Sequence, residues 1–141
     1  PNQPLESAIC AAAVRGISVE IITAEKPDHA FMNWALKGNL HELLARGCKV
    51  YLAGPNFDHS KFLLIDNDYM SIGSANWDAR SLRLNYELNI ELIGSPLGEQ
   101  LAELFDYKKR HSKLYTLADL NNRPSWQKLR DGFARLFTPY L

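Results

Sequence analysis

Residues 59–76 read HSKFLLIDNDYMSIGSAN, and they contain two short apolar runs separated by polar residues. The runs Lys61 to Asp66 and Tyr69 to Gly73 each have the length and composition of a β-strand. Asn67 and Asp68 between them favour a tight turn, although the glycine preferred in two-residue turns is missing. The stretch therefore predicts a β-hairpin near the middle of the chain.

Upstream of this hairpin, two helix patterns alternate with two strand patterns. Apolar residues recur at helical spacing over residues 4–16, and a β-branched run over residues 17–23 predicts a strand. A second helix is expected from a cap at Asp28 to about residue 46, and a second strand over residues 48–53. This alternation is typical of α/β domains.

Downstream of the hairpin, residues 77–84 predict a loop or one helical turn, and residues 85–93 alternate as a strand does. Residues 94–113 predict a helix, and residues 125–137 predict a last amphipathic helix. Together these elements predict an α/β fold in which a mixed β-sheet is flanked by helices on both faces. The length of 141 residues suits a single domain covering residues 1–141.

Charge limits the classes of partner. Lys plus Arg and Asp plus Glu both number 16, so the formal net charge is zero. Proteins that bind a polyanion usually carry an excess of basic residues, so this balance argues against a nucleic-acid partner.

No apolar run in the sequence reaches the roughly 18 residues of a membrane span. Cys10 and Cys48 form no C-x-x-C pair and are expected to be buried thiols.

The residues that carry chemistry surround the predicted hairpin. His59 and Lys61 share a face if the strand begins by His59. Imidazole can act as a nucleophile or proton donor, and an ammonium beside it can neutralise phosphate oxygens. Ser74 and Asn76 can hold an anion and orient Lys61. This set of groups indicates in-line attack at phosphorus, where positioning and charge stabilisation supply most of the catalysis.

The spacing H-x-K-x4-D-x6-G-S-x-N over residues 59–76 resembles the HKD motif of the phospholipase D superfamily. The run D-x-R-S-x-x-L-N-x-E-L over residues 78–88 resembles bacterial cardiolipin synthases within that superfamily. The end of the chain, residues 135–139, is also similar. The resemblance covers nearly the whole chain and is that of the C-terminal catalytic half of such proteins, with the N-terminal half absent from this sequence.

The resemblance implies a mechanism without metal or cofactor. One HKD histidine attacks phosphorus to form a phosphohistidine, and a second one protonates the leaving alcohol and then deprotonates the incoming one. His59 lies in what resembles the second copy, which favours the proton-transfer role, while a nucleophilic role stays open. Lys61 and Asp66 complete the motif, with Asp66 expected to be structural.

The same resemblance implies roles for the remaining site residues. Lys61 and Asn76 match residues that bind the phosphate oxygens, and Ser74 is expected to help them. Glu87 matches a carboxylate that hydrogen-bonds the histidine, fixes its tautomer and favours its protonated form. The expected activity is phosphatidyl transfer, such as the conversion of two phosphatidylglycerols into cardiolipin and glycerol.

The resemblance also implies partners. Only one full motif is present, so the second must come from another domain of the same protein or from a second identical chain. His111-Ser112-Lys113 is no second copy, because Asp119 is one residue late and no G-S-x-N follows. The expected surroundings are a phospholipid substrate and a membrane surface, at the cytoplasmic face or periphery of a bacterial inner membrane.

Two other functions fit parts of the sequence. A single motif in a short chain also suits a nuclease of the same superfamily that acts as a homodimer, although the neutral charge opposes this. A non-enzymatic binding module is the third reading, but binding alone would not require Lys61 and Asn76 together. The last helix could lie on a membrane, although packing on its own domain is favoured.

Overall fold

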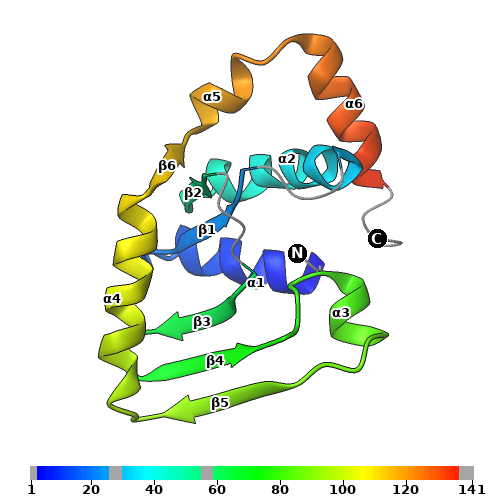
Figure 1. The fold of residues 1–141 in the computed structure, drawn as a ribbon. Helices are drawn as coiled ribbons and strands as arrows, with labels where there is room; N and C mark the ends of the chain where they lie inside the picture. The colour runs from blue at the N-terminus through cyan, green and yellow to red at the C-terminus, as the bar shows by residue number, and fades with distance from the viewer. Residues whose placement is uncertain (1–2, 26–29, 55–58, 137–141) are drawn as a thin grey trace.

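The computed structural model describes residues 3–25, 30–54 and 59–136, and Figure 1 shows their arrangement. In chain order the elements are α1 (Gln3–Val14), β1 (Glu20–Ala24), α2 (Ala30–Ala45), β2 (Lys49–Ala53), β3 (Lys61–Ile65), β4 (Tyr69–Gly73), α3 (Ala79–Arg83), β5 (Asn89–Ile93), α4 (Leu97–Arg110), β6 (Ser112–Tyr115), α5 (Leu117–Asn121) and α6 (Ser125–Leu136). The α/β class predicted from the sequence is confirmed. The predicted helix cap at Asp28 lies outside the described residues.

The strands form two three-stranded sheets, in the orders β1-β2-β6 and β3-β4-β5. In the first sheet β1 and β2 run parallel while β2 and β6 run antiparallel, so this sheet is mixed as predicted. The second sheet is antiparallel throughout. The division into two sheets was not predicted. The sequence pattern of a strand indicates the length and the buried face of that strand, but it does not identify the strands that pair with it.

Helices cover both faces of the first sheet, as the sequence predicts. Val50 and Leu52 of β2 point into the main core, and Tyr51 between them points to the other face. There the Tyr51 hydroxyl lies 3.5 Å from Glu20, which also accepts a hydrogen bond from Lys109 of α4. The main core therefore lies on the side of α1 and α2, and its buried members are Cys10, Leu40, Leu43, Cys48, Val50, Leu52, Tyr115 and Leu120.

Helix α4 also packs on the second sheet, where it covers one face. The rings of Phe62 in β3 and Phe105 in α4 meet edge to face, with centroids 6.3 Å apart. Met70 of β4 shares this face with Phe62 and is fully buried. Since side chains alternate along a strand, Lys61 and Leu63 lie on the face that α4 does not cover. Figure 1 shows α4 running along the edge of the molecule past both sheets.

The hairpin is confirmed, with its turn one residue earlier than predicted. Asp66 and Asn67 have φ values of 52° and 57°, and the Asp68 N–H donates to the Ile65 carbonyl at 3.0 Å. Two central residues in the left-handed region are the mark of a type I′ turn, and Asp and Asn tolerate this region better than most residues. This tolerance explains why the turn forms without glycine.

Other boundaries differ from the prediction. The strands predicted to begin at residues 17 and 85 begin at Glu20 and Asn89. Residues 79–83 form one helical turn, which was one of the two predictions for residues 77–84. The helix predicted to reach residue 113 ends at Arg110, because residues 112–115 pair with β2 as a strand. Helix α5 was not predicted, although Thr116 and Asp119 form a capping box at its start.

The predicted state of the cysteines is confirmed. Cys10 and Cys48 are free, buried thiols, and burial is the main cause that raises the pKa of both. They behave as small apolar side chains of the main core. Among the described residues, no helix is long and apolar enough to cross a membrane.

Candidate functional site

The first half of the candidate site is the pair His59 and Lys61. Lys61 is the first residue of β3, and His59 precedes this strand. The Lys61 ammonium lies 2.6 Å from Nδ1 of His59 and donates to the His59 carbonyl at 2.8 Å. An ammonium has protons and no lone pair, so Nδ1 of His59 is the acceptor in this contact. The predicted proximity of the two groups is thus present, with Nε2 as the remaining ring nitrogen.

The second half of the site lies directly beside this pair, at the end of β4. Gly73 is the register partner of Lys61. A Cβ atom at Gly73 would collide with the Leu88 carbonyl and with Asn89, so only glycine allows the segment before β5 to approach so closely. The Ser74 N–H donates to the Leu88 carbonyl at 3.0 Å, and the Leu88 N–H donates to the Ser74 hydroxyl at 3.1 Å. Ser74 is therefore held at a fixed place beside Lys61.

Glu87 joins the site through Ser74. The Ser74 hydroxyl donates to one Glu87 carboxylate oxygen at 2.5 Å, and the Asn85 amide donates to the other at 3.3 Å. These two hydrogen bonds lower the pKa of Glu87, and the positive charge of Lys61 lowers it further. Glu87 is thus ionised near neutral pH. The hydrogen bond expected between Glu87 and His59 stays a prediction.

Helix α3 positions the residues around Glu87. Asp78 caps this helix by accepting from the Ser81 N–H at 2.7 Å, and the Ser81 side chain is buried. The Asn85 amide lies 3.5 Å from the Ser81 hydroxyl, a long contact that places Asn85 for its bond to Glu87. Asn85 and Ser81 were not selected from the sequence. Both belong to the run of residues 78–88, so a signal for them was present.

Two further predicted residues lie outside this cluster of contacts. Asn76 follows Ser74 by two residues and is exposed. Its binding of phosphate stays a prediction. Asp66 lies in the hairpin turn, at the end of β3 opposite to Lys61. The fold does not bring Asp66 together with His59 and Lys61, which agrees with the structural role expected for it.

The second His-Ser-Lys triplet has a different environment. His111 is the C-terminal cap of α4, and its Nδ1 lies 2.8 Å from the Tyr107 carbonyl. The rings of Tyr107 and His111 have centroids 4.3 Å apart. Lys113 belongs to β6 and pairs with Leu52. His111 thus ends a helix, and its contacts are unlike those of His59.

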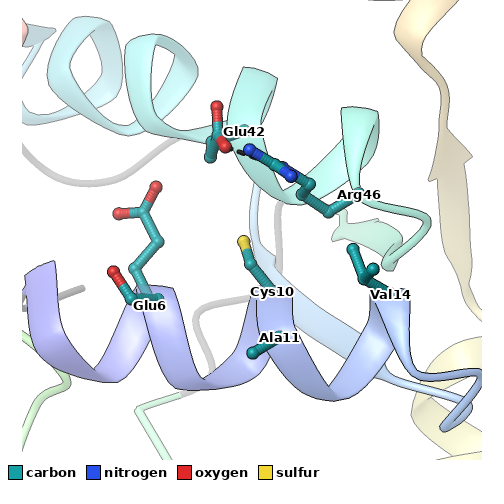
Figure 2. Close-up of a pocket in the computed structure, with 7 residues that line it drawn as sticks. Glu6, Cys10, Ala11, Val14, Glu42 and Arg46 are labelled. Carbon is teal, nitrogen blue, oxygen red and sulfur yellow. Dashed lines mark hydrogen bonds and ion pairs between the residues drawn. The ribbon is translucent and has the colours of Figure 1, made fainter.

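The described residues hold no metal-binding cluster, and the cleft that they form between α1 and α2 lies apart from the candidate site. In residues 3–25, 30–54 and 59–136, no group of three or more His, Cys, Asp or Glu side chains could hold a metal ion. Figure 2 shows a cleft between α1 and α2 that is lined by Glu6, Cys10 and Arg46 among others. Glu42 and Arg46, one turn apart at the end of α2, form an ion pair of 2.9 Å on the α2 side of this cleft. None of the candidate site residues lines this cleft.

Comparison with known proteins identifies the family of this chain. Residues 1–109 match the family model described as "Cardiolipin synthase, PLD-like domain". The chain belongs to this family of phospholipase D-like (PLD-like) domains. The resemblance inferred from the HKD-type spacing and the run after it is therefore confirmed.

Individual relatives agree with this membership. The chain is 38% identical over 141 residues to cardiolipin synthase 1 of Staphylococcus epidermidis, and 34% identical over 141 residues to the major cardiolipin synthase ClsA of Bacillus subtilis. Each match covers 100% of this chain and 29% of the relative. The chain thus spans less than a third of the length of these proteins.

A solved structure shows the same fold. The phospholipase D family member Nuc from Salmonella typhimurium superposes with a TM-score of 0.71 and 22% sequence identity. The match covers 82% of this chain and 75% of that one. At this level of identity the likeness establishes the PLD-like fold alone.

Proposed function

We propose that this PLD-like domain supplies one HKD motif to a phosphatidyltransferase that makes cardiolipin from two phosphatidylglycerols. The observation that carries the proposal is that two hydrogen-bonded pairs, His59 with Lys61 and Ser74 with Glu87, lie on neighbouring strands, where Lys61 is the register partner of Gly73. An imidazole, a cation and neutral donors beside each other are what phosphoryl transfer needs. The cardiolipin synthase relatives support the choice of a lipid phosphodiester as substrate.

Lys61 and the segment after β4 bind the phosphate in this proposal. The Lys61 ammonium neutralises the non-bridging oxygens of the phosphodiester, and Asn76 donates hydrogen bonds to them. Ser74 joins them when its one hydroxyl proton, which Glu87 accepts in the free protein, turns toward the phosphate. Charge that accumulates at phosphorus during attack is stabilised by groups already in position.

His59 transfers protons in the proposed reaction. The histidine of the other HKD motif attacks phosphorus, and the bond from phosphorus to the departing glycerol oxygen breaks as the phosphohistidine forms. Protonated His59 gives its Nε2 proton to that oxygen. It then takes a proton from the hydroxyl of a second phosphatidylglycerol, which attacks the phosphohistidine and releases the free histidine.

Glu87 positions this centre through its charge. Its carboxylate is ionised, holds the Ser74 hydroxyl and lies close enough to Lys61 to be influenced by that charge. In this proposal Glu87 also hydrogen-bonds the His59 ring, as the family resemblance implies, and fixes its tautomer. We therefore assign Glu87 as a positioning residue rather than as a group that contacts the substrate.

The lipid assay should compare the two His-Ser-Lys triplets. The protein that carries this chain together with its second HKD motif is incubated with phosphatidylglycerol vesicles, and the lipids are separated by thin-layer chromatography. His59→Ala should abolish cardiolipin formation, and His111→Ala should retain it because His111 caps a helix. Cardiolipin formation by His59→Ala at the wild-type rate would reject the proposal.

A homodimeric nuclease is the less favoured alternative. The net charge of zero and the cardiolipin synthase relatives both speak against it. Incubating the same preparation with single- and double-stranded DNA separates the two activities. Cleavage of DNA in the absence of lipid, lost in His59→Ala, would favour the nuclease instead.

A further inference from the structure

Helix α6 is fixed on α2 by charged and aromatic groups, so its orientation is determined. Asp131 of α6 is only 2% exposed and is held by Arg123 and by Arg130, whose Nη2 lies 2.9 Å from its carboxylate. The Arg130 guanidinium lies 4.3 Å from the ring centre of Trp34 in α2 and 5.1 Å from that of Trp126. The favoured expectation that this helix packs on its own domain agrees with these contacts (Figure 1).

This packing leaves an apolar stripe of α6 in solvent. Trp126, Leu129 and Phe133 are 62%, 78% and 61% exposed. Their spacings of three and four residues put them on one side of the helix. Large apolar side chains gathered in this way usually mark a surface that binds a partner or a membrane.

Basic side chains outnumber acidic ones in the segment around the stripe, residues 123–136. Among the described side chains of this segment, Arg123, Lys128 and Arg130 stand against the single acid Asp131, which makes 3 − 1 = +2 in a chain of net charge zero. Asp131 is buried in its ion pairs and presents no negative charge to the outside. Lys128 is exposed and lies next to Leu129. The segment is therefore complementary to an anionic surface.

We propose that the exposed stripe of α6 docks on the surface of an anionic phospholipid bilayer. Trp, Leu and Phe on one side with Lys and Arg beside them is the composition of helices that lie in a membrane interface. The stripe lies outside residues 1–109, which carry the family match, and it does not depend on the proposed phosphatidyl transfer. Lipid binding can be measured without turnover, so the two proposals can fail separately.

The test is flotation of the 141-residue chain with lipid vesicles. Vesicles of phosphatidylglycerol and phosphatidylcholine in equal parts should bind the chain, and vesicles of phosphatidylcholine alone should bind it more weakly. Leu129→Gln should weaken binding about tenfold, because an apolar side chain is lost from the interface. Lys128→Gln should weaken it about fivefold and only with the anionic vesicles.

Val14→Gln is the matched control, since Val14 is an exposed apolar residue at the end of a different helix. It should bind vesicles as the wild type does, and thermal unfolding should show all variants folded. Equal binding by Leu129→Gln and the wild type, or no binding at all, would overturn the proposal. A dimer in solution that Leu129→Gln dissociates would also overturn it, because a second copy would then cover the stripe.

Discussion

At the scale of single residues, Glu87 is the group whose protonation reports most directly on the site. Its carboxylate accepts from Ser74 and Asn85, and these bonds, with Lys61 nearby, lower its pKa. His59 and Lys61 were predictable because a spacing of two residues near a strand places side chains together. Asn85 was not, since only the folding of α3 brings its amide to Glu87.

Replacing the main hydrogen-bond donor of Glu87 should change its ionisation. Ser74→Ala removes the bond that contributes most to the lowered pKa, so the pKa of Glu87 should rise toward the ordinary glutamate value of about 4.3. NMR titration of the side-chain carboxyl carbon measures this shift. Ser71→Ala is the control, because Ser71 pairs with Glu91 and should leave the Glu87 titration unchanged. An unchanged titration in Ser74→Ala would contradict the arrangement.

At the scale of elements, the hairpin and the segment after it hold the site together. The hairpin is encoded locally by two apolar runs and turn-forming residues, so the sequence predicts it well. Strand β6 is different, because its partner β2 lies far away along the chain and its own pattern continues the helix before it. The end of this strand was signalled only by Thr116 and Asp119, which form the capping box at the start of α5.

The close approach of β4 and the segment before β5 should not tolerate a side chain at Gly73. Gly73→Ala forces a Cβ against the Leu88 carbonyl and Asn89, so the free energy of unfolding should fall by about 2 kcal/mol or more. Gly132→Ala is the matched control, because nothing lies within 4 Å of the added Cβ and the position is inside α6. This control should gain about 1 kcal/mol from helix propensity. Urea unfolding compares both variants with the wild type, and equal stability of Gly73→Ala would refute the close approach.

At the scale of the whole molecule, α4 joins the two sheets. Its Phe105 packs on Phe62 of the second sheet, while Lys109 binds Glu20 of the first at 2.8 Å. The bond from Lys109 is the largest cause that lowers the pKa of Glu20, and bonds to Glu20 and Asp106 raise the pKa of Lys109. Neither the division into two sheets nor their connection by α4 can be derived from strand patterns alone.

The stability that Lys109 supplies should depend on pH. The pKa of Glu20 is lower in the folded protein than in the unfolded chain, where it is about 4.3, so ionised Glu20 stabilises the fold at pH values above this value. This stabilisation is lost as the pH falls through the pKa of Glu20 in the folded protein. The raised pKa of Lys109 stabilises the fold below about 10.4, and this part is lost as pH rises through the folded value. Lys109→Met should therefore cost about 1 kcal/mol between roughly pH 5 and 10, and less below about pH 4. Urea unfolding over this range, with exposed Lys128→Met as control, measures the difference. A cost that does not change with pH would exclude the ion pair as its source.

The most direct test of the phosphate centre is an NMR titration of the 141-residue chain with inorganic phosphate. The His59 ring and the backbone amides of Ser74 and Asn76 should shift together and saturate at one common dissociation constant, while the His111 ring should stay unchanged. Shifts at His59, Ser74 and Asn76 that follow different curves, or a His111 response as large as that of His59, would contradict a single phosphate-binding centre at these residues.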